Sequence, residues 1–253
     1  MAENIKTIQL RLNSVNKISK ITNAMKLVSM SKLMNYQRRI KGLDELADEF
    51  EKLQTETYEN GRDLPTLAIA FATDLGLASL YNKTIQRSVD KLAPDAVMWI
   101  GNQGYERYQK NPDIELVNDK MSSDNLILSD LYDEVTALMQ KYQLKIAIPE
   151  MDSDTLVVKW KELNKQLHKS DTIVYEPDYA SANKRYQELY TFMTLNQSYY
   201  QSKYTENLTR RIAMEQATDN ANDMREELTN RYNQIRQEEI TQEILELSAG
   251  VVQ

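Results

Sequence analysis

The stretch IKTIQLRLNSVNKISKITNAMKLVSMSKL, residues 5–33, decides how the rest of the chain is interpreted. Apolar residues recur in it at steps of three and four, the spacing of one face of an α-helix. The spacing continues to Leu53, no proline precedes Pro65, and Gly42 is the only interior residue of low helix propensity. About 55 residues at 1.5 Å each form a helix of roughly 80 Å, and so narrow a stripe on it predicts a coiled coil. The stripe comprises Ile5, Ile8, Leu12, Val15, Ile18 or Ile21, Met25, Val28, Tyr36, Ile40, Leu43, Phe50 and Leu53.

The C-terminal part of the chain has the same character. No proline follows Ala180, and Gly250 is the only glycine in that segment. Two long amphipathic helices at opposite ends of one chain predict an antiparallel pair, formed by residues 1–60 and 180–253. Its stripe comprises Tyr186, Leu189, Met193, Tyr200, Tyr204, Leu208, Ile212, Ala217, Ala221, Met224, Leu228, Ile235, Ile240, Ile244 and Leu247. Small side chains that would let the helices approach closely are Ala213, Ala217 and Ala221.

The segment between the helices, residues 64–178, alternates strand-like and helix-like stretches. TLAIAFA, AVMWI and DIELV are strand-like, a helical stretch follows Asp74, and QGYERYQK indicates a short helix. SDNLILSDLYDEVTALMQKY predicts an amphipathic helix with an Asp or Ser cap. LKIAIPE, DTLVVKW and DTIVYEP are again strand-like. This order predicts an open α/β sheet with an antiparallel edge.

Composition excludes several classes of protein. The hydrophobic fraction of 41% and the charged fraction of 27% are typical of a soluble protein, and no apolar run of about 18 residues could span a membrane. Residues 1–30 lack the apolar core of a secretory signal, so we expect a cytoplasmic protein. No cysteine is present, which excludes disulfides and thiolate metal sites.

The net charge of -7 conceals a basic N-terminal segment followed by an acidic one. A basic helix is typical of a surface that faces nucleic acid, a membrane or an acidic partner, or of an ordinary solvated face. Tyr36 is the only aromatic residue before Phe50, so we expect neither nucleic-acid binding nor a membrane-surface helix. The basic residues are Lys6, Arg11, Lys17, Lys20, Lys26, Lys32, Arg38, Arg39 and Lys41, and the acidic ones Asp44, Glu45, Asp48, Glu49, Glu51, Glu56 and Glu59.

We predict no catalytic, cofactor or metal site. GNQG, residues 101–104, follows a strand, but the chain has neither GxGxxG nor GxxxxGK[ST], so an ordinary strand-to-helix turn is favoured over a phosphate-binding turn. Asp152 and Asp154 share a turn-like segment and are interpreted as loop residues rather than a catalytic pair. His168 is the only histidine, so no Ser/His/Asp set is readable, and His168 is interpreted as a surface or hairpin residue rather than part of a triad or metal site.

Both ends of the chain resemble a known family. IKTIQLRLNSVNKISKITNAMKLVSMSKL (5–33) resembles the N-terminal helix of the gamma subunit of F-type ATP synthases, which carries I-K-x-R-I-x-S-V and K-I-T-x-A-M-K-M-V-A-x-x-K. RRIAMEQATDNANDMREELTNRYNQIRQEEITQEILELSAG (210–250) is similar to the second long helix of that family. It contains the elements A-M-x-x-A-x-x-N-A, Y-N-x-x-R-Q and I-T-x-E-I-x-E.

The middle of the chain resembles the family more loosely. ATDLGLASLYN is similar to S-D-x-G-L-C-G-x-x-N, with Asp74, Gly76, Leu77 and Asn82 retained and residues 78–80 changed to Ala-Ser-Leu. AVMWIGNQG resembles a strand ending in I-G-x-x-G, and YEP (175–177) the return into the second helix. The segment also looks shorter than is usual in the family.

The resemblance implies a long antiparallel two-helix coiled coil from both termini plus a small Rossmann-like α/β domain. The protein would be the non-catalytic central shaft of a rotary ATPase, surrounded by the alpha and beta subunits of an F1-type hexamer. An epsilon-type subunit and a membrane ring, or a replacement adaptor, would bind the α/β domain, and the complex would lie on the inner face of the cell membrane. Two alternatives stay open: a gamma-like shaft of a specialised ATPase that is not coupled to a proton-translocating ring, such as a motility-linked motor of wall-less bacteria, and a coiled-coil scaffold without ATPase partners.

The resemblance also implies partner contacts. A polar patch near the end of the second helix would face loops of the beta subunit, and the terminal SAGVVQ would turn in an apolar collar. A lower contact, near an acidic segment of the beta subunit, would use Met25, Lys26 and Arg210. The patch comprises Arg236, Gln237, Thr241, Gln242, Glu243 and Glu246.

Overall fold

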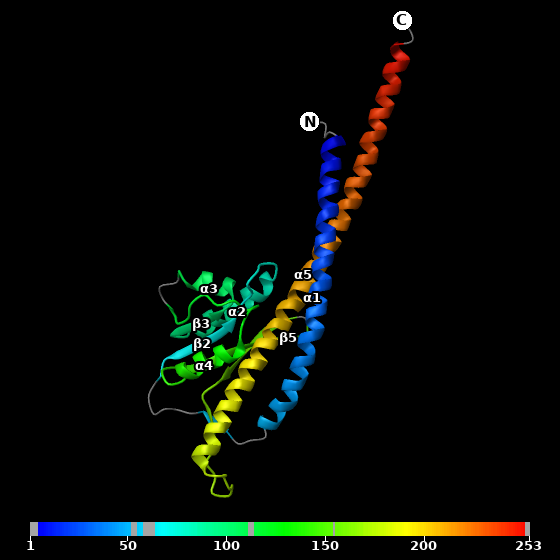
Figure 1. Cartoon of the computed structure of the whole chain (residues 1–253). Coiled ribbons are helices and arrows are strands. Elements are labelled where there is room, and N and C mark those ends of the chain that lie inside the picture. The colour runs from blue at the N-terminus through cyan, green and yellow to red at the C-terminus, as the bar shows by residue number, and fades with distance from the viewer. Residues whose placement is uncertain (1–4, 52–54, 58–63, 111–113, 154, 251–253) are drawn as a thin grey trace. The chain divides into compact units, whose positions relative to one another are not determined.

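The computed structural model describes residues 5–51, 55–57, 64–110, 114–153 and 155–250. Two long helices, α1 (Ile5–Glu51) and α5 (Tyr179–Gly250), account for the two ends of the chain. Contacts divide the chain into two compact units, one of residues 1–30 and 210–253 and the other of residues 31–209. Both long helices contribute to both units, so the fold is the predicted α/β class with long helices at its two ends (Figure 1).

A five-stranded sheet forms the centre of the second unit, in the order β4-β3-β2-β5-β6. The first four strands run parallel and β6 runs antiparallel to β5, which confirms the open sheet with an antiparallel edge. A separate pair joins β1 to β7 in antiparallel register. The strands are β1 (Thr55–Thr57), β2 (Thr66–Phe71), β3 (Ala96–Ile100), β4 (Glu115–Leu116), β5 (Gln143–Asp152), β6 (Thr155–Glu162) and β7 (Lys165–Leu167).

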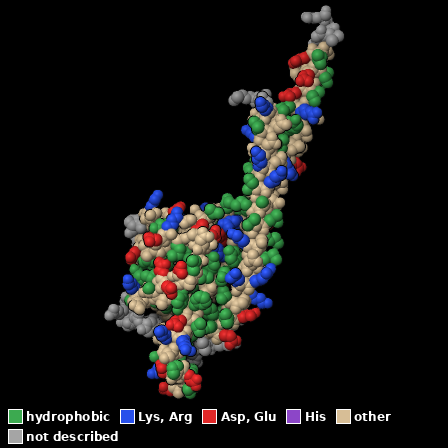
Figure 2. Space-filling model, in the orientation of Figure 1, with side chains coloured by type: hydrophobic (Ala, Val, Ile, Leu, Met, Phe, Trp, Pro, Cys, Tyr) green, Lys and Arg blue, Asp and Glu red, His purple; other side chains and the backbone are tan. Residues whose placement is uncertain are grey.

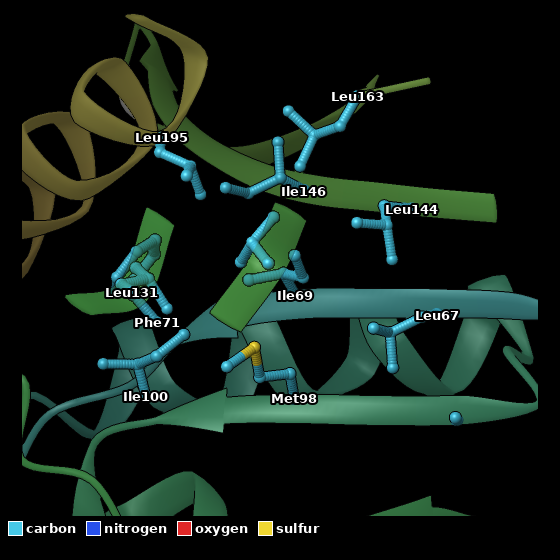
Figure 3. Packing of buried hydrophobic residues seen from close by; sticks show 12 residues of the cluster. Leu67, Ile69, Phe71, Met98, Ile100, Leu131, Leu144, Ile146, Leu163 and Leu195 are labelled. Carbon is cyan, nitrogen blue, oxygen red and sulfur yellow. The ribbon is translucent and has the colours of Figure 1, made fainter. Parts of the chain in front are cut away.

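Side chains on alternate positions of β2 enter two different cores. Leu67, Ile69 and Phe71 pack with Leu131 and Val135 of α4 (Leu128–Leu138) and with α5. Figure 3 shows these β2 side chains with Leu131 of α4 and Leu195 of α5. The alanines at 68 and 70 face α2 (Ser79–Leu92) and α3 (Asn102–Tyr108), where their small size leaves room for the larger aromatic side chains of that core. A parallel strand covered on both faces is apolar at every position, which explains the continuous run LAIAF.

Three local predictions differ from the structure. Helix α1 ends at Glu51 and strand β1 follows, although the predicted N-terminal helix extended to residue 60; Leu53, the last residue of its stripe, lies outside the described residues. Helix α4 begins after Ile127 and has no side-chain cap, where an Asp or Ser cap was predicted. DTIVYEP forms turns rather than a strand, because its polar groups bond locally: the Tyr175 hydroxyl donates to the His168 carbonyl.

Candidate partner-contact surfaces

The first unit is an antiparallel helix pair. Three contacts fix its register: the Ser19 hydroxyl donates to Asn222, the Thr22 and Thr218 hydroxyls lie 2.7 Å apart, and Lys26 pairs with Glu215 at 3.7 Å. Along α1 the covered positions recur at alternating steps of three and four, the heptad pattern of a coiled coil. The positions of this repeat are Ile5, Ile8, Leu12, Val15, Ser19, Thr22, Lys26 and Ser29, and Asn16 and Met25 are half-buried beside it. The predicted coiled coil is therefore confirmed.

The second half of this seam is polar. Its first four positions are apolar, whereas the last four carry hydroxyl or ammonium groups. Thr22 and Ser29 are as deeply buried as Val15, and the Thr22 and Thr218 hydroxyls satisfy each other across the pair. Polar residues at heptad positions fix register and orientation at some expense of stability, so the seam selects one alignment of the two helices.

The apolar residues predicted for that half of the seam lie outside it. Ile18, Ile21 and Val28 were expected to face the partner helix, but each is exposed, Ile21 by 60%, and Met25 is half-buried. The prediction was wrong because the apolar spacing passes to a neighbouring face of α1 after Val15, while the seam continues through polar residues. These four residues form an outer stripe on α1, at steps of three, four and three.

The far part of α5 has no partner among the described residues of α1. Counting equally along both helices from the Ser19–Asn222 contact places Ile5, where the description of α1 begins, opposite Arg236. Ile235 is half-buried, and every described side chain from Arg236 to Ser248 is exposed. Residues 236–250 therefore form a single helical extension of roughly 20 Å, here called the tip.

The structure places all six residues of the predicted polar patch on the tip. Within the tip, the Thr241 hydroxyl donates to the Gln237 carbonyl and Gln242 donates to Glu246. Ile240, Ile244 and Leu247 form one face beside them, with Leu247 exposed by 72%. Figure 2 shows hydrophobic and acidic side chains intermixed along this end of α5. Val251 and Val252 lie outside the described residues.

The predicted lower contact lies within the paired segment. Met25, Lys26 and Arg210 are each half-buried, and all three belong to the first unit. Lys26 pairs with Glu215, which also accepts Arg211 at 3.8 Å. Part of the basic charge of α1 is therefore balanced within the chain. The exposed lysines of α1 in this region are Lys17, Lys20 and Lys32.

The turn at GNQG is filled by protein groups. The Asp74 carboxylate accepts the backbone N–H of Asn102, at the start of α3, and those of Ser123 and Asp124. Burial by itself would raise the pKa of Asp74, but these hydrogen bonds and one from the Ser122 hydroxyl hold it below its usual value. Gly101, at φ +116°, approaches so closely that a Cβ would lie 2.1 Å from the Ala72 carbonyl oxygen. A carboxylate thus occupies the position that a phosphate would need.

Two further properties bear on function. Among the described residues, His, Asp and Glu side chains form no group that could hold a metal ion. Within the described part of the chain, we find no helix with the length and apolar character needed to cross a membrane. No sequence pattern indicated that α1 has a separate outer stripe, or that Lys203 is buried among polar partners in the second unit.

Comparison with known proteins identifies the family. The sequence profile of the ATP synthase family matches residues 4–252. The ATP synthase gamma chain of Mycoplasmopsis pulmonis is 31% identical over 96% of this chain and 97% of its own length. That of Mycoplasmopsis synoviae is 31% identical, with 98% of each chain covered. A chain of the Euglena gracilis mitochondrial ATP synthase, solved as OSCP/F1/c-ring in rotational state 3, has a TM-score of 0.74 at 14% identity, covering 98% of this chain and 93% of that one. Because both the profile and these relatives match almost from end to end, the chain belongs to the gamma-chain family of the ATP synthases.

Proposed function

We propose that this chain is the central rotor shaft of an F-type rotary ATPase and couples its own rotation to ATP synthesis or hydrolysis on surrounding alpha and beta subunits. As a gamma chain it is the non-catalytic subunit of the complex. In this proposal, residues 1–60 and 180–253 form the shaft and residues 64–178 form the body.

The single observation that carries the proposal is the unpaired tip of α5. A face of isoleucine and leucine on an isolated helix is unfavourable in water, because exposed apolar area costs about 25 cal/mol per Å². Ile240, Ile244 and Leu247 nevertheless form such a face, and the described part of α1 does not reach it. Partner subunits that surround the tip would cover this face.

The paired segment has the mechanical properties of a coupling element. Two helices are stiffer than one, and the polar half of the seam fixes their alignment through directional bonds. A single helix pair also lacks the threefold symmetry of a ring of alternating subunits. It would therefore press differently on each catalytic site and favour a different conformation in each.

We propose two contact regions with the catalytic hexamer. On the tip, the polar patch from Arg236 to Glu246 would hydrogen-bond to loops of the beta subunit beside the apolar face. On α1, the outer stripe around Met25, with Lys26 and Arg210 nearby, would meet a second part of the beta subunit. Exposed ion pairs contribute only about 0–1 kcal/mol each, so such contacts can form and break as the shaft turns.

The remaining partners are inferred from the family. The Euglena chain was solved with F1 and a c-ring, and we propose that the body of this chain binds a membrane ring and an epsilon-type subunit. The complex would then lie peripherally on the cytoplasmic face of the cell membrane. Both relatives named above carry the name ATP synthase gamma chain, and neither points to a motility-linked motor or to a scaffold without ATPase partners.

The test is reassembly with the host's alpha and beta subunits. We expect the chain to form a stable complex with them, and Ile244→Asp to reduce its affinity about tenfold or more, because a charge would be buried against an apolar collar. Asn233→Asp adds the same charge at an exposed position of the paired segment and is expected to bind normally. Failure of the unaltered chain to bind, or equal binding by both variants, would contradict the proposal.

A further inference from the structure

Lys203 is a fully buried charge in the second unit. Its side chain is 3% exposed, and its three N–H donors are all used. They reach the Ser123 hydroxyl at 2.8 Å, the Asp124 carboxylate at 2.6 Å and the Glu206 carboxylate at 3.2 Å. Burial by itself lowers the pKa of Lys203, but Glu206 and Asp124 outweigh it and raise the pKa. These four residues, here called the Lys203 cluster, join α5 to the loop that precedes α4 through directional bonds.

That loop is itself fixed to the sheet. The backbone N–H groups of Ser123 and Asp124 donate to the Asp74 carboxylate at 3.1 and 2.8 Å. Asp74 follows β2, the central strand, and also accepts from the start of α3. A continuous chain of charge-assisted hydrogen bonds therefore runs from the end of the central strand, through one loop, to the side of α5.

A second set of bonds fixes the same stretch of α5. Strand β2 pairs with β5 only as far as Ile146, which leaves later carbonyls of β5 free on that side. The Ser198 hydroxyl donates to the Ala147 carbonyl at 2.6 Å, and the Thr205 hydroxyl donates to the Pro149 carbonyl at 3.2 Å. Helix α5 thus supplies hydrogen bonds where a neighbouring strand would, and Figure 1 shows α5 passing beside β5.

We propose that the Lys203 cluster is the joint through which α5 and the α/β body turn as one piece. This inference rests on the proposed function as a rotor shaft. Apolar burial is non-directional, so it fixes the rotational position of a helix less sharply than hydrogen bonds to defined acceptors do. Lys203, by contrast, must keep the Ser123 hydroxyl and the Asp124 carboxylate of the loop within hydrogen-bond distance, so rotation of α5 about its own axis would break these two bonds. Lys203 is a positioning residue for torque transfer.

Two variants test the joint. Lys203→Met removes the charge and takes one charged partner from the buried Glu206 carboxylate, which is strongly destabilising. A triple variant, Asp124→Asn with Lys203→Met and Glu206→Gln, keeps the approximate shapes and removes all three charges of the cluster together. The matched control is Lys159→Met, which breaks an exposed ion pair with Glu150 in the same unit. Each chain is assembled with the other subunits of the host complex in membrane vesicles.

The readouts are the ATP hydrolysis rate and the number of ions transported per ATP. We expect the triple variant to keep the hydrolysis rate within about twofold while the number of ions transported per ATP falls about twofold or more. Without the cluster, α5 would rotate without turning the body through the same angle at each step. The control should change neither. Normal transport per ATP in the triple variant would overturn the inference while leaving the proposed function intact. Failure of the unaltered chain to assemble would instead reject the proposed function.

Hydrogen exchange of the unaltered full chain decides the case in which a variant does not assemble. If the joint is real, the Ser123 and Asp124 amides exchange in step with the α5 amides near Lys203, because all open together. Exchange at Ser123 and Asp124 that is roughly tenfold faster than in α5 would show that the loop opens independently, and would overturn the inference.

Discussion

A disulfide between positions 22 and 218 tests the register of the helix pair. The Thr22 and Thr218 hydroxyl oxygens lie 2.7 Å apart, so cysteines at both positions would bring their sulfurs together after a small adjustment. The chain has no other cysteine, so no competing disulfide can form within it. The bond would close a loop between positions 196 residues apart, which in the chain-entropy treatment stabilises the fold by about 5 kcal/mol.

The loss of the hydroxyl pair offsets about 1 kcal/mol of that gain, which leaves about 4 kcal/mol as the upper value. For a chain of this size, that corresponds to an increase in Tm of roughly 10 °C in the oxidised protein relative to the reduced one. Non-reducing electrophoresis would show the closed loop, and thermal unfolding with and without reductant would give the shift.

The matched control pairs Ile21→Cys with Thr218→Cys. Ile21 is adjacent to Thr22 in sequence but points to the outer face, so this pair should stay reduced within one chain. The disulfide of the Thr22→Cys, Thr218→Cys variant should also leave ATP hydrolysis by the assembled complex unchanged, because we expect both helices to turn together. Efficient closure of the control pair would refute the register, and inhibition by the correct disulfide would show that the two helices must move past each other.

Three further predictions use the same unfolding measurements. Asp74→Asn should destabilise the chain by about 2–3 kcal/mol, because an amide cannot accept all four donors. Since the pKa of Asp74 is lowered in the folded chain, the stability difference between the two chains should be full at neutral pH. It should shrink as the pH falls below 3.8, the ordinary pKa of an aspartate. Gly104→Ala places a Cβ 2.3 Å from the Trp99 ring and should cost about 1–3 kcal/mol, whereas Gly76→Ala, with nothing within 4 Å of its Cβ, should change stability by less than about 0.5 kcal/mol. Ile21→Asp should leave the unfolding midpoint unchanged but weaken binding to alpha and beta subunits about tenfold, and a shifted midpoint would place Ile21 inside the seam after all.

The regular elements could be predicted because their signals are long or repeated. The absence of proline over the two end segments and their apolar periodicity predicted α1 and α5, and the runs LAIAF and AVMWI predicted the buried strands β2 and β3. The antiparallel edge followed from two adjacent strand-like stretches near residue 150, joined by a short turn. Each of these patterns extends over several residues, so one residue that departs from the pattern does not change the predicted element.

The seam of the helix pair could be predicted only in part. A search for apolar residues at helical spacing is correct as long as the seam is apolar, as from Ile5 to Val15. After Val15 the buried positions carry hydroxyls and a lysine, while isoleucines stand one position earlier along the helix. Hydrophobicity alone then selects the wrong face. A strict heptad count from Ile8 would have kept the seam through Thr22 and Ser29.

The Lys203 cluster could not be predicted, because its members are brought together by tertiary structure. Ser123 and Asp124 are about 80 residues from Lys203 in the chain, and an isolated lysine on a polar helix is usually exposed. The contact residues of the tip are a different case. Their exposure follows from the extension of α5 beyond α1, while their assignment to partner loops still rests on the resemblance to the family and awaits the binding tests.

The outer stripe has a consequence for how the protein is made. Helix α1 carries two faces with apolar residues, the seam as far as Val15 and the outer stripe, and the segment of α5 that covers the seam is synthesised more than 180 residues after Ser29. At roughly 5–20 residues per second, ribosomes need on the order of 10–40 s to reach Met214, and both faces lack their partners throughout that interval. Under the proposed contacts, the second face stays open until the other subunits arrive. The newly made N-terminal helix is therefore a natural client for chaperones, and an excess of this chain over its partner subunits should aggregate through α1.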